Sequence, residues 1–471
     1  MPSSPINRLI ESLAGAVTRE GDRLTVSNAQ ALAAGMDGLV REAVFGDPEA
    51  KAAARWIIGE SAQALGIRPA SIHDFYRAEG RSDAPPRFTV PAINLRMLAY
   101  DLARAVFRAA GKIDAGAFIF EIARSEIGYT DQRPAEYAAA VLAAAIREGF
   151  RGPVFLQGDH FQISAKKYAA APDSEIKAIR DLIAESIGAG FYNIDIDTST
   201  LVDLNKPTLA EQQKLNYERC AEFTSFIRDQ QPKNVVISVG GEIGEVGLKN
   251  STPEDLEAFM TGFDKMRGAR EGISKISIQT GTSHGGVVLP DGTLAQVAID
   301  FGTLRLLSQE ARRKYGMGGA VQHGASTLPE TAFHKFVEAA ACEVHLATAF
   351  QSLVMDHKSV PDGLRREMVE WVKAHAGDER KPKDTEAQFI YKTRKKAVGP
   401  FKKNFWSLPA DTLAAIGADL EKTFSFLFGE LAIAGTREMV AKTIRAPEIH
   451  RPAPEGAEKA VQHKHVDGLA D

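Results

Sequence analysis

The sequence predicts an α/β protein built around a (β/α)8 TIM barrel, with helical extensions at both ends. Between residues 86 and 357, eight short apolar runs rich in Val, Ile and Phe alternate with longer amphipathic segments. Several of these amphipathic segments end in glycine, a common signal for the end of a helix. An open, doubly wound sheet is the competing fold, because it has the same alternation of strands and helices.

The expected strands follow one another along this central region. In chain order they are FTVPAIN (88–94), AGAFIFEI (115–122), GPVFLQGD (152–159), FYNIDID (191–197), NVVISVG (234–240), SKISIQTG (274–281), GGAVQHG (318–324) and CEVHLAT (342–348). Two of the clearest intervening helices are PAEYAAAVLAAAIREGF and SEIKAIRDLIAESIGAGF, which carry apolar residues at three- and four-residue spacing.

Two flanking regions lie outside the expected barrel. Residues 1–85 show helical periodicity and form an expected N-terminal helical extension, which ends near the linker GRSDAPPRF. Residues 358–471 begin with a charged segment, continue with helices and end in a tail of disordered composition. The sequence leaves open whether the N-terminal helices form an oligomer interface or cover the bottom of the barrel.

The composition is that of a globular protein and excludes several classes of partner. The chain has 471 residues, 44% hydrophobic and 25% charged, with a formal net charge of −4. This small charge gives no electrostatic reason to expect nucleic acid or an anionic membrane as a partner. Because the sequence shows neither a secretory leader pattern nor an apolar run of about 18 residues, we expect a cytoplasmic protein.

Histidines and an aspartate collect at the carboxyl ends of the expected strands, the face that carries the active site in barrel enzymes. The third strand ends at Asp159 and His160, the sixth is followed by His284, and the seventh reaches His323. A single histidine is more often a packed or capping residue than a ligand. Three from different strands, however, can converge only at the barrel mouth, and three imidazoles leave an open position on a catalytic Zn²⁺.

Carboxylates and glycine-rich turns accompany these histidines. Asp195 and Asp197 share one face of the fourth strand, and Glu242 ends the fifth. Acids beside a cation and acids that cap turns both fit this pattern. The turns GGEIGEVG, SHGG and HGAS offer backbone N–H groups that could hold an anion such as phosphate.

Taken together, these motifs resemble those of the class II, zinc-dependent ketose-bisphosphate aldolases, the fructose- and tagatose-bisphosphate group. The resemblance covers about residues 90–348. The motifs that carry it are AIN (92–94), GDH (158–160), GFYNIDIDTS (190–199), GGEIGEVG (240–247), GTSHGG (281–286) and HGAS (323–326).

The resemblance implies a role for each residue of the metal centre. It implies that one catalytic Zn²⁺ is bound by His160, His284 and His323. It also implies that Glu242 and Asp197 belong to a second or alternative position for a divalent or monovalent cation.

The resemblance also implies the proton-transferring and substrate-binding residues. Asp159 would exchange a proton with the substrate hydroxyl at the cleaved bond. For the second acid the candidates are Glu245, Glu254 and Asp255, of which we select Glu245. The expected substrate-binding residues are Asn94, Gly285, Gly324, Ser326 and Thr348.

The implied activity is reversible aldol cleavage of a ketose phosphate or bisphosphate through an enediolate. Zinc would act as a Lewis acid where negative charge develops. The expected partner is therefore a small sugar phosphate. A homo-oligomer is expected because families of this kind are usually dimers or larger. A Schiff-base mechanism is not expected, because Lys275 begins the sixth strand at the end opposite the site.

Two other functions remain open. The segment EIARSEIGYTDQRPAEY (121–137) resembles the related tagatose-bisphosphate aldolase accessory subunits, which are barrels thought to support a separate catalytic chain. The second possibility is another metal-dependent lyase or isomerase of small sugars on the same scaffold.

Departures from the family pattern affect the substrate side of the site more than its histidines. The family's Asn-Ile-Asp-Thr-Asp stretch after the last strand reads His-Leu-Ala-Thr-Ala from His345 to Ala349. The turn HGAS replaces HGGS, and the loop VGLKNSTPED lacks the expected Glu-Asp pair.

Overall fold

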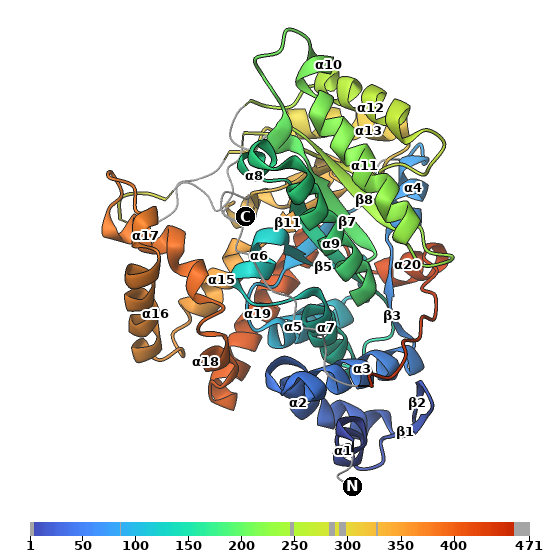
Figure 1. Ribbon diagram of the computed structural model, residues 1–471, viewed down its shortest axis with the longest axis vertical. Helices are drawn as coiled ribbons and strands as arrows, with labels where there is room; N and C mark the ends of the chain where they lie inside the picture. Colours follow the sequence, from blue (N-terminus) through green and yellow to red (C-terminus); the bar gives the residue numbers. More distant parts are fainter. Residues whose placement is uncertain are drawn as a thin grey trace.

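A closed parallel barrel forms the centre of the computed structural model, which describes residues 4–84, 86–244, 249–281, 288–291, 298–325 and 328–455 (Figure 1). Neighbouring barrel strands pair in parallel, and the β6–β7 pairing closes the ring. The barrel strands are β4 (Val90–Asn94), β5 (Ile119–Ala123), β6 (Gly152–Gln162), β7 (Asn193–Asp197), β8 (Ser238–Ile243), β9 (Lys275–Ile278), β10 (Ala320–Gln322) and β11 (Glu343–Leu346). Each predicted run overlaps one of these strands, and β5, β6 and β8 extend one to three residues beyond their runs. The predicted (β/α)8 fold is therefore confirmed.

Helices connect the strands and surround the barrel. They are α5 (Ala99–Lys112), α6 (Arg124–Tyr129), α7 (Pro134–Arg147), α8 (Ala165–Ala170), α9 (Pro172–Ala189), α10 (Leu209–Gln212), α11 (Lys214–Gln230), α12 (Pro253–Arg267), α13 (Phe301–Tyr315), α14 (His334–Glu338) and α15 (Thr348–Met355). Helix α9 ends as its sequence predicts, because Gly190 has a φ of 97° and supplies the left-handed residue that stops the helix.

The N-terminal region contains strands as well as the expected helices. Its elements are α1 (Pro5–Ser12), β1 (Val17–Glu20), β2 (Arg23–Val26), α2 (Ala29–Phe45), α3 (Pro48–Ala64), β3 (Ile67–Ala70) and α4 (His73–Gly80). Strand β3 joins the central sheet by pairing with the start of β6, from Gly152 to Phe155. The Asn193 side chain reinforces this attachment, since it donates to the Ala70 carbonyl and accepts from the Ile72 amide. A four-residue strand is too short to produce a periodic pattern, so the sequence did not reveal it.

The C-terminal region is helical and packs beside the barrel. Its helices are α16 (Asp362–His375), α17 (Glu386–Thr393), α18 (Lys402–Trp406), α19 (Ala410–Glu430) and α20 (Thr436–Thr443). The aromatic rings of Phe424 and Phe428 on α19 pack against Phe350 and Phe118 at centroid distances of 4.8 and 5.9 Å. Helices α16 and α17 lie to one side of the barrel in Figure 1.

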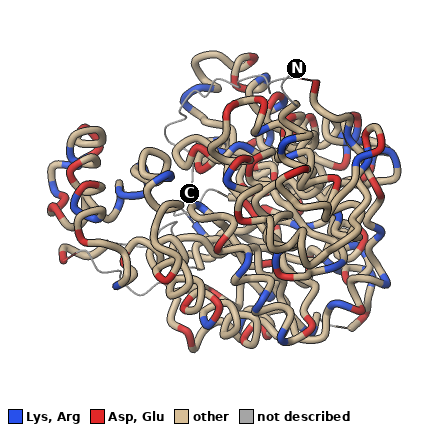
Figure 2. Tube along the Cα trace, turned by 90° about the horizontal axis from the view of Figure 1, so that it is seen from below, with Lys and Arg blue, Asp and Glu red and all other residues tan. Residues whose placement is uncertain are grey.

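Acidic and basic residues are interspersed along the chain in Figure 2. This mixture agrees with the small net charge of −4. Among the helices that the structure describes, none combines the length and apolarity needed to cross a bilayer.

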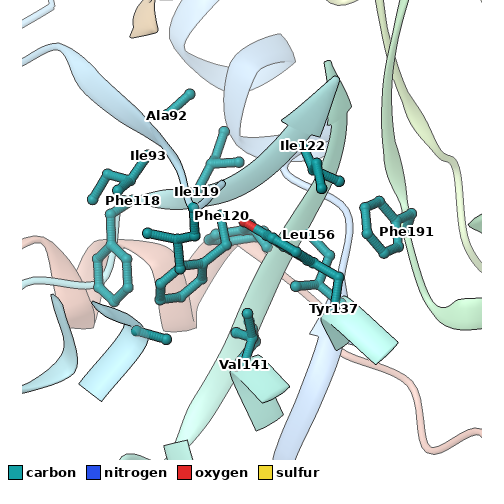
Figure 3. Close-up of a cluster of buried hydrophobic side chains, with 14 of the residues drawn as sticks. Ala92, Ile93, Phe118, Ile119, Phe120, Ile122, Tyr137, Val141, Leu156 and Phe191 are labelled. Atoms are coloured by element: carbon teal, nitrogen blue, oxygen red, sulfur yellow. The ribbon is translucent and has the colours of Figure 1, made fainter. Parts of the chain in front are cut away.

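A cluster of apolar side chains fills the space between the barrel wall and its outer helices. Figure 3 shows Phe118, Phe120 and Leu156 gathered with Tyr137 and Val141 of α7. Even the polar end of Tyr137 is satisfied, because its hydroxyl donates to the Glu121 carbonyl oxygen at 2.6 Å. This packing supports β5 and β6, the strands whose carboxyl ends carry several of the candidate site residues.

The barrel interior, in contrast, contains a buried ionic network. The ammonium of Lys275 lies 2.6 Å from Glu343, 2.9 Å from Asp195 and 2.7 Å from the Gln157 side-chain oxygen. Burial would lower the pKa of Lys275, but Asp195 and Glu343 outweigh that effect and raise it above its ordinary value. A lysine that is held as ammonium is a poor Schiff-base nucleophile.

Space for this network depends on a glycine in β8. A Cβ atom at Gly240 would overlap the Asp195 carboxylate and press on the Lys275 side chain. The N-terminal region also takes part, because the Tyr76 hydroxyl of α4 donates to Glu343 Oε2 at 2.5 Å.

We expect Tyr76→Phe to lower the free energy of unfolding by about 1–3 kcal/mol, because it leaves a buried carboxylate without one of its donors. Tyr100→Phe is the matched control. Its hydroxyl also donates to a carboxylate, at 2.6 Å, but the Asp37 acceptor is 53% exposed and can bond to water instead. Urea unfolding of both variants checks the difference. An equal loss in the two would contradict a special role for the Glu343 contact.

Candidate active site

A bulge in β6 brings Asp159 and His160 to the barrel mouth together. The pairing of β6 with β7 shifts register between Gly158 and Phe161, and His160 has a φ of 38° in the left-handed region. The Phe161 ring occupies the space in which a Gly158 side chain would lie. Strained backbone and bulges of this kind often direct side chains into functional sites.

His160 lies among carboxylates from three strands. Its Nδ1 is 3.1 Å from Asp197 Oδ2 and 3.4 Å from Glu242 Oε2, and its Nε2 is 3.9 Å from Asp159 Oδ1. All four side chains are buried. Burial alone would lower the pKa of His160, but the carboxylates of Asp159, Asp197 and Glu242 outweigh it and raise the pKa well above its ordinary value.

The two acids beside His160 differ in their environments. Burial would raise the pKa of Asp197, but the hydrogen bonds from His160, Ser199 and Gln162 hold it below its usual value. Burial raises the pKa of Glu242 to about 7, and the charge of Asp197 adds to this effect. The pKa of Asp197 is therefore lowered and that of Glu242 raised, although both acids contact the same imidazole.

His323 joins this group from the end of β10. Its ring centroid lies 4.2 Å from that of His160 and 4.0 Å from that of His345. Its Nε2 is 3.0 Å from the Ser277 hydroxyl of β9. A hydrogen bond at one ring nitrogen sets the tautomer and orientation of an imidazole, and this is the usual support of a metal-binding histidine.

His345, on β11, was not among the predicted site residues, yet it lies at the centre of the site. Its Nδ1 is 2.9 Å from Glu121 and 3.3 Å from Asp159, and its Nε2 is 2.7 Å from Glu343. The sequence contained a signal for it, because Glu343 and His345 are two residues apart and must point to the same face of a strand. The polar face of β11 points into the barrel interior. Only the arrangement of all the strands reveals this orientation.

The site residues fit a cation with nitrogen and oxygen ligands. Donor atoms of Asp159, His160 and His323 lie within 4.8 Å of one another, and so do those of His160, Asp197 and Glu242. Small side-chain rotations would bring such atoms to the ~2.1 Å bonds that zinc makes with imidazole and carboxylate. The Asp159, His160 and His323 group is buried and combines two imidazoles with an acid, a donor set that suits zinc.

Some of the remaining predicted residues lie outside the part of the chain that the structure describes, and the others lie within it. Those that fall outside the described residues are Glu245, His284, Gly285 and Ser326. Gly324 follows His323 with a φ of 70°. Among the alternative acids, Glu254 is exposed, and Asp255 accepts hydrogen bonds from Thr252 at the start of α12.

Asn94 and Thr348 are connected through a buried ion pair at the same end of the barrel. Arg96 Nε donates to Glu126 Oε1 at 2.6 Å, and the Asn94 amide donates to Glu126 Oε2 at the same distance. The Arg96 guanidinium also donates to the Thr348 hydroxyl at 3.4 Å. Neither Arg96 nor Glu126 was predicted from the sequence to take part.

Several solved structures are similar to this chain. A fructuronate-tagaturonate epimerase, UxaE, from Cohnella laeviribosi has a TM-score of 0.54 at 12% identity, and the alignment covers 89% of this chain and 90% of that one. A probable tagatose 6 phosphate kinase from Sinorhizobium meliloti 1021 has a TM-score of 0.50 at 18% identity, covering 78% and 95%. A fructose-bisphosphate aldolase, Fba, from Campylobacter jejuni has a TM-score of 0.45 at 19% identity, covering 79% and 97%. At such identities the likeness extends to the fold alone.

No curated protein sequence matches this chain. Residues 84–403, by contrast, match the family described as Fructose-bisphosphate aldolase class-II. The match includes every barrel strand and continues through α17 to residues of α18. Because it spans well over half of the 471 residues, this chain belongs to the class II fructose-bisphosphate aldolase family.

Proposed function

We propose that this chain is a zinc-dependent aldolase that reversibly cleaves a ketose phosphate or bisphosphate. The observation that carries the proposal is the buried group of Asp159, His160 and His323, which meet at the carboxyl ends of β6 and β10. An acid beside two imidazoles suits an aldol cleavage, which needs both charge stabilisation and a proton acceptor.

The metal site in this proposal consists of His160, His323 and His284, the last of which lies outside the described residues. Bound zinc supplies Lewis-acid polarisation of the substrate oxygens. Asp197 accepts from Ser199 and Gln162 and contacts His160 at 3.1 Å, so it holds that imidazole in a fixed orientation. Glu242, on the same side of His160, would complete a second cation position with Asp197.

Asp159 is the residue that moves the proton at the cleaved bond. Its carboxylate lies beside His160 and His345, at 3.9 and 3.3 Å. It would accept the proton of the substrate hydroxyl as the carbon–carbon bond breaks and return it to the alkoxide in the reverse direction. Glu245 is our candidate for the second proton transfer, at the carbon that becomes nucleophilic.

The substrate chain extends from the metal toward the Arg96–Glu126 pair. Asn94 and Thr348, both bonded to this pair, would contact sugar hydroxyls. Backbone N–H groups around Gly285, Gly324 and Ser326 would hold a phosphate. As a working expectation from the family, the enzyme is a cytoplasmic homo-oligomer of carbohydrate metabolism.

A second candidate function is epimerisation of a sugar acid by the same bond chemistry. The observation that favours it is a second imidazole–carboxylate contact at the site, His345 with Glu121, where the family pattern has asparagine in place of the histidine. Cleavage followed by recombination on the opposite face of the aldehyde would invert one carbon without releasing a fragment. Because the similar Cohnella laeviribosi protein is described as a fructuronate-tagaturonate epimerase, these two acids belong in a substrate panel.

Removal of metal should abolish the activity. We expect the purified chain to contain zinc, to lose aldehyde release after dialysis against dipicolinate, and to regain it when zinc is added, because no protein group replaces the Lewis acid. His323→Ala should reduce aldehyde release below detection. His334→Ala, on the exposed surface of α14, is the control and should be unaffected. Full activity of the chelated protein would refute zinc dependence.

Asp159→Asn should lower kcat by ~10²–10⁴-fold while zinc remains bound to the histidines, because the amide cannot accept the proton. Steady-state kinetics with parallel elemental analysis checks this. Asp203→Asn, at a position outside the site where the side chain is 43% exposed, is the matched control. A kcat within a few-fold of the parent chain would assign proton transfer to another residue.

Product analysis separates the candidate functions. When the lone chain is incubated with ketose phosphates, ketose bisphosphates, fructuronate and tagaturonate, we expect release of an aldehyde and a phosphorylated ketone, detected by coupled assay and by NMR. Inversion of one carbon with no aldehyde in solution would favour the epimerase. The absence of any conversion until another subunit is added would favour an accessory barrel.

A further inference from the structure

The strongest feature that the proposed function leaves unexplained is the environment of His345 Nδ1. Two carboxylate oxygens face this nitrogen, Glu121 Oε2 at 2.9 Å and Asp159 Oδ1 at 3.3 Å. Glu121 is fully buried, and Asp159 and His345 are each 5% exposed. Water therefore has little access to this group of three donors.

The distances around His345 Nδ1 are those expected between ligands of a common cation. Neither ring nitrogen of His345 makes a hydrogen bond with the described residues, although carboxylate oxygens lie within 2.9 Å of both. At such a distance the oxygens must lie well to the side of the ring N–H directions. Two atoms bound at about 2.1 Å to one cation lie beside each other in this way, about 3.0–3.4 Å apart for octahedral or tetrahedral angles.

The two sides of the His345 ring differ in one respect. On the Nε2 side, Glu343 and Asp195 already share a cation, the Lys275 ammonium. On the Nδ1 side, Glu121 makes no ion pair with a lysine or arginine of the described chain, and its Oε1 has no hydrogen-bond donor there. The Nδ1 side is therefore the side on which positive charge is missing.

The total charge of the barrel interior leads to the same conclusion. Among the residues that the structure describes, six buried carboxylates surround His160, His323 and His345, namely Glu121, Asp159, Asp195, Asp197, Glu242 and Glu343. Nearby Arg96 and Arg124 are occupied by two further acids, Glu126 and Glu175. With all six acids ionised, one ammonium and one zinc ion balance only three of the negative charges, and uncompensated charges are destabilising in a buried site.

We propose that Glu121, Asp159 and His345 bind a second divalent transition-metal cation, distinct from the zinc ion on His160 and His323 and from the position beside Asp197 and Glu242. One imidazole with two carboxylates suits Zn²⁺ or Mn²⁺. Glu343, 2.7 Å from the other ring nitrogen and itself bonded to Tyr76, Gln157 and Lys275, holds the imidazole in place.

Asp159 connects the two metal sites, since it belongs to both donor groups. Paired cations at about 3.5–4 Å can hold two oxygens of one substrate at the same time. A cation at this position would also keep Asp159 ionised, the form that accepts a proton. The site does not depend on the aldolase proposal, because any substrate with adjacent oxygens could use it.

Metal stoichiometry tests the site without a substrate. The full chain is stripped with dipicolinate, titrated with Zn²⁺ or Mn²⁺, desalted and assayed by elemental analysis, with calorimetry in parallel. We expect His345→Asn and Glu121→Gln each to bind one equivalent fewer than the parent chain. His345→Asn restores the residue of the family pattern, and Glu121→Gln keeps the side-chain volume. His73→Asn, which removes another buried imidazole beside an acid, should retain the full number.

Each outcome decides the proposal. Equal metal content in the parent chain and either site variant overturns it, and would assign the positive charge at His345 to a proton. If a variant loses all metal or fails to fold, as judged by circular dichroism, anomalous scattering from crystals of the parent chain decides instead. A peak between His345 Nδ1 and Glu121 supports the site, and the absence of a peak there overturns it. Because no activity is measured, failure of the aldolase proposal would not affect this result.

Discussion

The buried ammonium of Lys275 is the interaction on which the rest of this barrel depends. It neutralises Glu343 and Asp195 in the middle of the barrel, and these acids in turn contact His345, Tyr76 and Gln157. Without that positive charge, two adjacent buried carboxylates would repel each other and would have to take up protons. Gly240 is required for the same reason, because any side chain there would displace the pair. The polar interior is therefore a single connected network that reaches from the N-terminal helix α4 to the barrel mouth.

The candidate active site lies at the carboxyl ends of the strands, next to this network. The register shift in β6 places both Asp159 and His160 at the mouth, although neighbouring residues of a regular strand point to opposite faces. The rings of His323 and His345 then follow one another beside His160, tilted by 41° and 48° between neighbours and each from a different strand. The acids around them are close enough to serve as metal ligands, as proton acceptors or as supports of the imidazoles. In the proposed metal-bound site, the role of each acid depends on which cations are bound.

Much of the candidate site could be predicted from the sequence. Apolar runs mark the strands, and parallel strands share one direction. Parallel strands bring their carboxyl ends to one face, so Asp159, His160 and His323 could be placed together from their positions after apolar runs. Glu242 and Asp197 could be placed at the same face by the same argument. The structure brings both within 3.4 Å of His160. Glu121, His345 and the role of Lys275 did not follow, because the sequence does not show which face of β5, β9 and β11 points into the barrel. Lys275 begins β9 at the end remote from the mouth, but a four-carbon side chain can extend along the barrel interior from there.

The sequence by itself therefore determined the barrel, the order of its strands and the residues that end them, since these depend on local periodicity and on the shared direction of parallel strands. Only the tertiary structure decided which interior charges meet. A strand can turn either of its faces inward, and a bulge or a glycine changes which side chains fit there. The contacts among Glu121, His345, Glu343 and Lys275 join strands that are more than 200 residues apart in the chain, from β5 to β11. Such contacts exist only once the barrel has closed. Closure removes these groups from water, and a buried charge without a compensating charge or hydrogen bond would be destabilising.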